Sequence, residues 1–229
     1  MHRILSSASC ALYSMHTLQR LHKAPDDFHY GGGLGPIWMQ NNWEPSIRCF
    51  EDVRVGPHGD GGKWLCDPEC FLQSGNCTVW SIGSNNQFGF ELAMAPYGCD
   101  IHTFDHTVAH PNPPEGVSFW PYGASGVDGE GVKSLETLKD LSNTTGIVDV
   151  LKIDCEGCEF EVFSDPKTLE FISNNVRQIM VEVHFKNSAQ TEQLAQSLTD
   201  AGFRVFSKEP NIQFSDGSCV EYALLNTRM

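Results

Sequence analysis

One short segment near the middle of the chain changes abruptly from apolar to reactive residue types. Apolar residues run up to Ile153. The next five positions hold two acids, two thiols and a glycine: Asp154, Cys155, Glu156, Gly157 and Cys158. Carboxylates directly after a buried strand can act as acids or bases at the rim of a sheet. The thiols, spaced Cys-x-x-Cys, can instead form a metal or redox site.

A second polar pair stands near the end of the apolar run VRQIMVEVHF. Glu182 and His184 are two residues apart, so in a strand both side chains point to one face. Ligands of parallel α/β sheets bind beyond the carboxyl ends of the strands, so this pair should converge with the acids after Ile153. Glu159 either joins them or supplies negative charge to a helix start. The predicted catalytic residues are Asp154, Glu156, Glu182 and His184.

Metal chemistry is an alternative at the same place. Asp154, Glu182 and His184 could hold Mg²⁺, which can orient a hydroxyl group for reaction. A zinc site on Cys155 and Cys158 would need two further ligands at defined spacing. We therefore expect these two thiols to be packing residues, and we predict no bound metal, with Mg²⁺ as the alternative.

The segment VWSIGSNNQFGFE has the pattern strand, glycine turn, helix. Gly83 and Gly89 permit positive φ angles and close approach of a ligand, although their spacing is not G-x-G-x-x-G. Asp105 follows Gly83 by 22 residues, at the end of the next predicted strand. An acid at about that distance accepts hydrogen bonds from ribose hydroxyls. The pattern favours a ribose-bearing cofactor.

Apolar periodicity predicts the elements that position these residues. We expect strands at 78–83, 99–105, 116–124, 147–154, 176–185, 203–209 and 219–227. We expect helices at 88–98, 132–143, from about 159, and at 188–202, the last capped by Ser188. Strands that alternate with helices form a mostly parallel sheet covered on both faces, and the last two strands should form an antiparallel hairpin. We predict an α/β domain over residues 76–229.

Residues 1–75 show no sustained period beyond a first helix, and we expect an irregular N-terminal cover. Residues 1–23 are basic and serine-rich without an acid, which fits a transit peptide or an amphipathic surface helix. We expect the helix. The stretch HGDGGKW forms either a plain tight turn or a lid over the site, with His58 and Lys63 exposed.

Overall composition narrows the class of partner. The 229 residues carry a net charge of −14 without a cluster of Lys and Arg, which disfavours a nucleic-acid surface. No apolar run approaches the ~20 residues that a membrane span requires. Nine cysteines leave the disulfide state open, and four of them cluster between Cys49 and Cys77. We expect no nucleic-acid partner and no membrane span, and a cytoplasmic location rather than an organelle or the secretory lumen. Oligomeric state is undetermined.

Several segments resemble one enzyme family, in the same order along the chain. VDVLKIDCEGCEFEVF is similar to the DvlKiDvEGaE signature of FkbM-type methyltransferases and of related methyltransferase-like proteins of animals and algae. RVGPHGDGGKWLCDP, VWSIGSNNQFGFE, IHTFD and IMVEVHF are similar to segments of the second group. The resemblance covers about Trp43 to Thr227 and leaves out residues 1–42.

The resemblance implies a class I, Rossmann-like fold that binds S-adenosyl-L-methionine and ends in an antiparallel hairpin. It implies methyl transfer, and we expect a hydroxyl oxygen of a small molecule or sugar as acceptor. The expected cofactor contacts are Gly83, Ser84, Asn85, Gly89, Asp105, Gly123 and Ala124. A non-catalytic binding protein that keeps this fold is the main alternative, and a nicotinamide oxidoreductase is a third.

Overall fold

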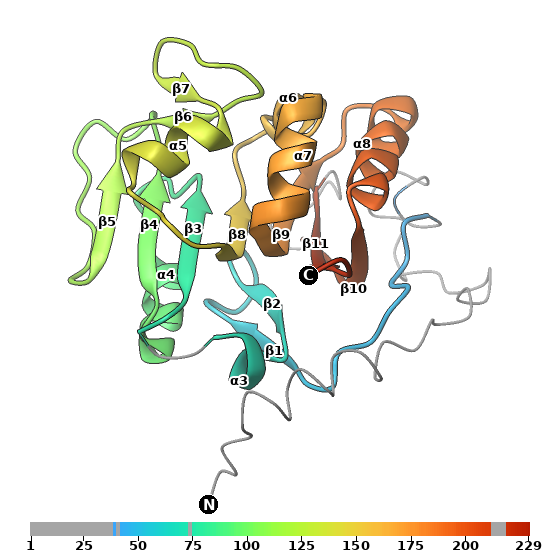
Figure 1. The fold of residues 1–229 in the computed structure, drawn as a ribbon, viewed down its shortest axis with the longest axis horizontal. Coiled ribbons are helices and arrows are strands. Elements are labelled where there is room, and N and C mark those ends of the chain that lie inside the picture. Colours follow the sequence, from blue (N-terminus) through green and yellow to red (C-terminus); the bar gives the residue numbers. More distant parts are fainter. Residues whose placement is uncertain (1–38, 40–41, 73–74, 212–218) are drawn as a thin grey trace, which may run out of the picture.

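The structure is a computed structural model that describes residues 39, 42–72, 75–211 and 219–229. Its main sheet (Figure 1) contains β3 (Thr78–Ile82), β4 (Asp100–Phe104), β5 (Val117–Trp120), β8 (Val148–Ile153), β9 (Val176–His184), β10 (Phe203–Pro210) and β11 (Cys219–Asn226). The strand order is β10-β11-β9-β8-β3-β4-β5. Strands from β9 to β5 are parallel, whereas β11 is antiparallel to β9 and β10. The predicted Rossmann-like α/β sheet with an antiparallel end is confirmed.

Helices cover both faces of this sheet. They are α4 (Gly89–Met94), the 3₁₀ turn η1 (Ala95–Tyr97), α5 (Leu135–Leu141), α6 (Glu159–Val162), α7 (Pro166–Asn175) and α8 (Ser188–Asp200). Leu138, Ile172 and Leu198 bury the apolar sides of α5, α7 and α8 in the main core, and Figure 1 shows α7 and α8 in front of the sheet. Phe90 of α4 belongs to a second cluster. Two covered faces explain why every residue of β8 is buried.

The N-terminal part contains a hairpin that the sequence did not predict. It consists of β1 (Asp52–Val55) and β2 (Lys63–Cys66), which pair antiparallel and are followed by α3 (Pro68–Phe71). The side chain of Gln178 in β9 donates to the carbonyl of Cys66 and accepts from its amide, both at 2.9 Å. The expected irregular cover is therefore partly ordered on the sheet. The division at residue 75 stays a prediction, and the expected first helix lies outside the described residues.

Three predicted boundaries are wrong in detail. The strand expected at 116–124 is two strands, β5 and β6 (Gly123–Ala124). The helix expected from Val132 starts at Leu135 because the Ser134 side chain accepts from the Thr137 amide, and Val132–Lys133 forms β7, which pairs with β6. The N-cap of α8 is Asn187, which accepts from the Gln190 amide at 2.9 Å, instead of Ser188.

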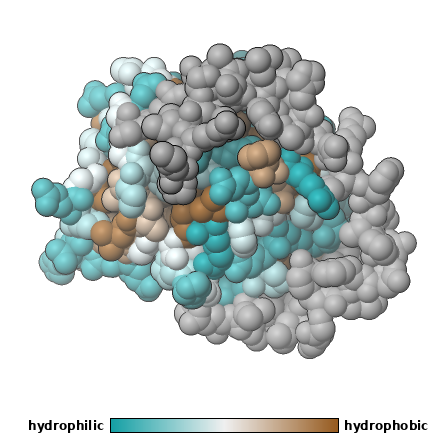
Figure 2. Space-filling view, turned by 90° about the horizontal axis from the view of Figure 1, so that it is seen from below, coloured by the Kyte–Doolittle hydropathy of each residue, from teal (hydrophilic) through white to brown (hydrophobic). Residues whose placement is uncertain are grey.

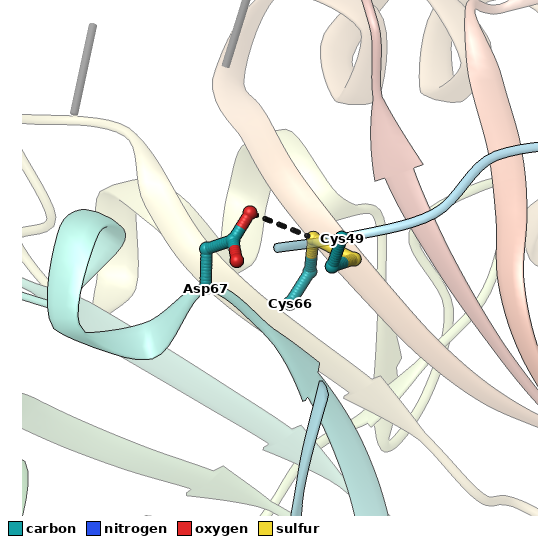
Figure 3. A group of neighbouring side chains, drawn as sticks. All are labelled: Cys49, Cys66 and Asp67. Atoms are coloured by element: carbon teal, nitrogen blue, oxygen red, sulfur yellow. Dashed lines mark hydrogen bonds between the residues drawn. A yellow bond between two sulfur atoms is a disulfide. The ribbon is translucent and has the colours of Figure 1, made fainter. Parts of the chain in front are cut away.

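Disulfides replace the thiol packing that we expected. Cys155 is bonded to Cys158, and Cys77 to Cys99. Figure 3 shows the bond between Cys49 and Cys66, with the Asp67 carboxylate 3.6 Å from the Cys66 sulfur. These bonds join segments separated by 3, 22 and 17 residues, respectively. The prediction that Cys155 and Cys158 merely fill space is therefore wrong.

The described surface is largely polar. Away from the C-terminal Met229, the large hydrophobic side chains exposed on it are Phe50, Leu92 and Val127. In the view of Figure 2, hydrophobic residues form small separate groups among hydrophilic ones. None of the described helices combines the length and the apolar character that crossing a bilayer requires.

Candidate active site

Three carboxylates lie side by side on one face of the sheet. Ile153 is the partner of Val181, so the next residues, Asp154 and Glu182, are neighbours at the carboxyl ends of β8 and β9. Glu221 lies directly opposite Glu182 in the register of β11 and β9. Glu182 is 4% exposed and Glu221 is 8% exposed. Like charges opposite one another repel, so this arrangement needs positive partners.

Two lysines supply those partners. The Nζ atom of Lys63 lies 3.3 Å from Oδ2 of Asp154 and forms an ion pair with Oε1 of Glu221. Lys152 Nζ lies 3.8 Å from the same Oδ2 atom of Asp154. The expectation that Lys63 is exposed in a lid is wrong: it is 2% exposed, because β2 packs on β9 and β11 and directs the side chain inward.

The surroundings of Asp154 and Glu182 shift the pKa values of these two neighbouring acids in opposite directions. Burial alone would raise the pKa of Asp154, but Lys152 and Lys63 lower it to about 2. Burial raises the pKa of Glu182 to about 8, and the charges of Glu221 and Asp154 add to this shift. Asn211 Nδ2 donates to Glu182 Oε1 at 2.9 Å. Near neutral pH the site therefore holds an ionised Asp154 beside a Glu182 that still binds a proton.

His184 lies at the rim of this cluster. Its Nε2 atom is 3.2 Å from Oε2 of the exposed Glu156, and its Nδ1 atom is 3.4 Å from Oε1 of Glu159. Burial would lower the pKa of His184, but the neighbouring Cys219 and Glu159 raise it to about 11. At neutral pH His184 is a cation. It is therefore less suited to accept a proton than Glu182.

Glu159 orders the loop between the two strands. It is fully buried, and its carboxylate accepts from the amide of Gly157 at 3.0 Å and from the amide of His184 at 2.9 Å. Glu156 in this loop has a φ of 57°, a conformation that non-glycine residues rarely adopt. The Cys155–Cys158 disulfide closes the same loop. Glu159 thus supports the site instead of facing an acceptor.

The glycine turn after β3 contacts the acid cluster directly. Gly83 has a φ of 81°, and a β-carbon there would collide with the carbonyl oxygen of Asp154. Lys152 Nζ donates to the Gly83 carbonyl at 2.5 Å. Gly89 has a different reason for lacking a side chain, since a β-carbon would lie 2.6 Å from Cγ of Pro57 in the β1–β2 loop.

Asp105 organises this turn. Its Oδ2 atom accepts from the amides of Ser84 and Asn85, both at 2.8 Å, and its Oδ1 atom accepts from the amide and hydroxyl of Thr107 at 2.9 and 2.6 Å. Burial would raise the pKa of Asp105, but these hydrogen bonds, led by Thr107, lower it. The carboxylate thus has an internal role that sequence reasoning missed. Its contact with a ribose stays a prediction.

The expected cofactor residues follow β3 or lie on its β4 side, whereas the expected catalytic residues lie on its β8 side. Gly123 and Ala124 are buried in β6, next to the β4 side of the turn, and a β-carbon on Gly123 would meet the ring of His106. The acids lie on β8 and β9, on the other side of β3. A bare glycine turn at the end of β3, with carboxylates beside it, fits a cofactor that carries a ribose and a sulfonium cation.

Residues 11–226 match a family model described as "Methyltransferase domain". The chain belongs to this methyltransferase family. The human "Probable methyltransferase-like protein 24" is 24% identical over 191 residues, covering 69% of this chain and 52% of that protein. The rat protein of the same name is 26% identical over 125 residues, covering 49% and 34%. The methyltransferase chain thus spans about half the length of the curated relatives it matches, or less.

Solved structures with a similar course of the chain include a Methanococcus jannaschii fibrillarin pre-rRNA processing protein. It has 8% sequence identity and a TM-score of 0.46, with 78% of this chain and 84% of that chain covered. A Burkholderia thailandensis 1,6-didemethyltoxoflavin-N1-methyltransferase has 14% identity and a TM-score of 0.42, with 67% and 72% covered.

In this methyltransferase a lysine side chain competes with metal ions for the carboxylates of the site. Among the described residues, Asp60, Glu182 and Glu221 place carboxylate oxygens within 4.8 Å of one another, as do ligand atoms of Glu182, His184 and Cys219. The alternative Mg²⁺ set of Asp154, Glu182 and His184 is not among the described groups that converge in this way. The Lys63 ammonium already pairs with Glu221 and Asp154. The cluster thus carries its own cation.

Sequence reasoning missed three residues of the cluster. Lys63 lies in β2, Asn211 directly follows β10, and Glu221 lies in β11. The order of residues in the chain does not show that these segments meet. A partial signal exists for Lys63, since HGDGGKW is one of the segments that resemble the family.

Proposed function

We propose that this domain transfers the methyl group of S-adenosyl-L-methionine to a hydroxyl oxygen of a small molecule or sugar. One observation carries the proposal: an ionised Asp154 and a proton-binding Glu182 lie side by side against the glycine turn of a methyltransferase fold. Two carboxyl groups with separated pKa values form an acid–base pair. Membership in the FkbM-type subfamily is part of the same proposal.

Each group has a distinct task in this proposal. The cofactor, when bound, supplies an electrophilic methyl group. Glu182, with a pKa near 8, is ionised in a minority of molecules at neutral pH, and in that form it would accept the hydroxyl proton as the acceptor oxygen bonds to the methyl carbon and the carbon–sulfur bond of the cofactor breaks. Asp154 stays ionised and favours positive charge near the donor. His184 and Glu156, which lie at the exposed rim, contact the acceptor. Gly83, Ser84, Asn85, Gly89, Asp105, Gly123 and Ala124 form the donor side.

The acceptor is inferred from charge. A chain with a net charge of −14 and an acidic site repels polyanions, so we propose a neutral or cationic small molecule instead of RNA or DNA. Hydroxyl-rich sugars fit, because buried carboxylates and amides such as Asn211 bind hydroxyl groups well.

We also propose that the protein works in an oxidising compartment. Disulfides persist in secretory and extracellular spaces and are rare in the cytosol. The bonds Cys49–Cys66, Cys77–Cys99 and Cys155–Cys158 therefore favour a secretory lumen over the cytoplasmic location expected from the sequence. Thiol counting by mass spectrometry on protein from its native source tests this directly, and fully reduced cysteines would contradict it.

Cofactor binding is the first test. We expect S-adenosylhomocysteine to bind and to raise the melting temperature, as a ligand of the native state must. Gly83→Ala should abolish binding, because its methyl group collides with the Asp154 backbone. Gly146→Ala is the matched control, since a β-carbon at Gly146 meets nothing within 4 Å. Calorimetry on both variants decides the assignment.

Three outcomes would contradict the proposal. Binding of NAD without binding of S-adenosylhomocysteine would point to an oxidoreductase. Cofactor binding without transfer of a labelled methyl group to any member of a broad panel of sugars and small alcohols would favour the non-catalytic alternative. Transfer to nitrogen alone would remove O-methylation and leave a methyltransferase with another kind of acceptor.

A further inference from the structure

Lys63 reaches the active site from an element outside the Rossmann-like sheet. It is the first residue of β2, and the loop before it contains four glycines with positive φ or crowded β-positions: Gly56, Gly59, Gly61 and Gly62. A β-carbon at Gly62 would collide with the Pro57 carbonyl and the Arg54 guanidinium. The loop thus folds back tightly and turns the Lys63 side chain toward the sheet, where it is 2% exposed.

Lys63 links the two halves of the site. On one side its ammonium pairs with Glu221 of β11; on the other it lies 3.3 Å from Asp154 after β8. Asp154 is held by Lys152 as well, and Lys152 donates to the carbonyl of Gly83. A continuous series of polar contacts therefore runs from Glu221 through Lys63, Asp154 and Lys152 to the cofactor turn.

The buried negative charge beside Lys63 exceeds the positive charge, and Lys63 reduces the excess. The groups that face it or its partners are Lys152 and Asp154 of β8, Glu182 and His184 of β9, Glu221 of β11, and Asp60 of the loop before β2. In the buried part, two ammonium groups face three carboxylates, so one proton is needed for neutrality. Removal of Lys63 would leave three carboxylates with Lys152 alone.

We propose that Lys63 is a positioning residue for methyl transfer, whose ammonium group keeps Asp154 ionised and fixed beside Glu182. This inference rests on the proposed function. Lys63 does not touch the reacting atoms; it acts through Asp154 and Glu182. An opposite charge within about 4–6 Å lowers a carboxyl pKa by about 1–3 units, so its loss raises the pKa of Asp154 by that amount.

Carboxyl titration by ¹³C nuclear magnetic resonance tests the proposal without an acceptor. In Lys63→Met we expect the measured pKa of Asp154 to be about 1–3 pH units higher than in wild type. In Lys63→Arg we expect this pKa to stay close to the wild-type value. Lys208→Met is the matched control: Lys208 has a side chain that is 2% exposed and pairs with Glu44, away from Asp154. A role in packing alone would not distinguish Lys63→Met from Lys63→Arg.

Glu221→Gln supplies a second measurement if Lys63→Met does not fold. The charge of Glu221 raises the pKa of Glu182, so this variant should lower the Glu182 titration, opposite in sign to the effect of losing Lys63. Unmoved titration of Asp154 in folded Lys63→Met, or of Glu182 in Glu221→Gln, would overturn the coupling. Absence of S-adenosylhomocysteine binding by wild type would instead refute the proposed function and leave the titration result standing.

Discussion

At the scale of single residues, the site shows how one chemical group acquires two roles. Asp154 and Glu182 are both carboxylates on neighbouring strand ends, yet their pKa values move in opposite directions. Asp154 has two ammonium groups within 4 Å, whereas Glu182 faces Glu221 and Asp154. The identity of the neighbours, and not the identity of the acid, therefore decides which group keeps its proton.

Glu182 should make stability depend on pH in a defined direction. Its pKa rises on folding from 4.5 to about 8, so its contribution is complete below pH 4.5 and is lost as the pH rises to about 8. One proton corresponds to at most about 1.4 kcal/mol per pH unit. Glu182→Gln should flatten this decline in urea unfolding measured between pH 5 and 8 without reductant.

The exposed Glu192 of α8 offers the control for this measurement. Glu192→Gln should keep the wild-type dependence on pH. Parallel curves for wild type and Glu182→Gln would show that Glu182 titrates normally in the folded protein, and they would remove its assignment as the proton acceptor.

At the scale of elements, the sequence predicts the strands and helices that a local pattern of residue types determines. β3, β8 and β9 are apolar runs that end in polar residues, so both the strands and the acids at their ends could be found. The β1–β2 hairpin could not, since its strands have only four residues each and alternate poorly. Its order depends on contacts such as that of Gln178 with Cys66, and Lys63 therefore escaped prediction as a site residue.

The loop between β8 and α6 should depend on its disulfide. Without the Cys155–Cys158 bond, the loop that carries Glu156 in a left-handed conformation gains freedom, and ordering a residue again costs about 1 kcal/mol. Because Asp154 contacts Gly83, Cys155→Ala with Cys158→Ala should weaken S-adenosylhomocysteine about fivefold by calorimetry.

The Cys77–Cys99 pair is the control for this loop. It closes a longer segment, of 22 residues. Both cysteines lie at the N-terminal ends of β3 and β4, whereas the glycine turn follows the C-terminal end of β3. Its removal should cost about 3 kcal/mol of stability, against about 2 kcal/mol for Cys155–Cys158, while cofactor affinity is kept. Equal affinity in both double variants would show that the Cys155–Cys158 bond does not support the cofactor turn.

At the scale of the whole molecule, one face of the sheet carries a row of acids that the β1–β2 hairpin neutralises. Glu182, Glu221 and Glu209 are direct partners across β9, β11 and β10. Lys63 pairs with Glu221, while Arg54 Nε and Trp64 Nε1 donate to Glu209 at 3.0 and 2.5 Å. Electrostatic attraction thus adds to apolar packing where the hairpin covers the sheet.

This pairing sets an order of assembly. Arg54 and Lys63 are synthesised early. Asp154 follows Lys63 by 91 residues, but Glu209 follows Arg54 by 155 residues and Glu221 follows Lys63 by 158, so the hairpin lacks part of its counter-charge until β10 and β11 are made. Contacts so distant in sequence form slowly. In pulsed hydrogen exchange during refolding, the amides of β2 should gain protection no earlier than those of β11, and earlier protection of β2 would contradict this. The acid cluster around Lys63 is then among the last parts of the described fold to form, and a chain that stops before β11 lacks Glu221.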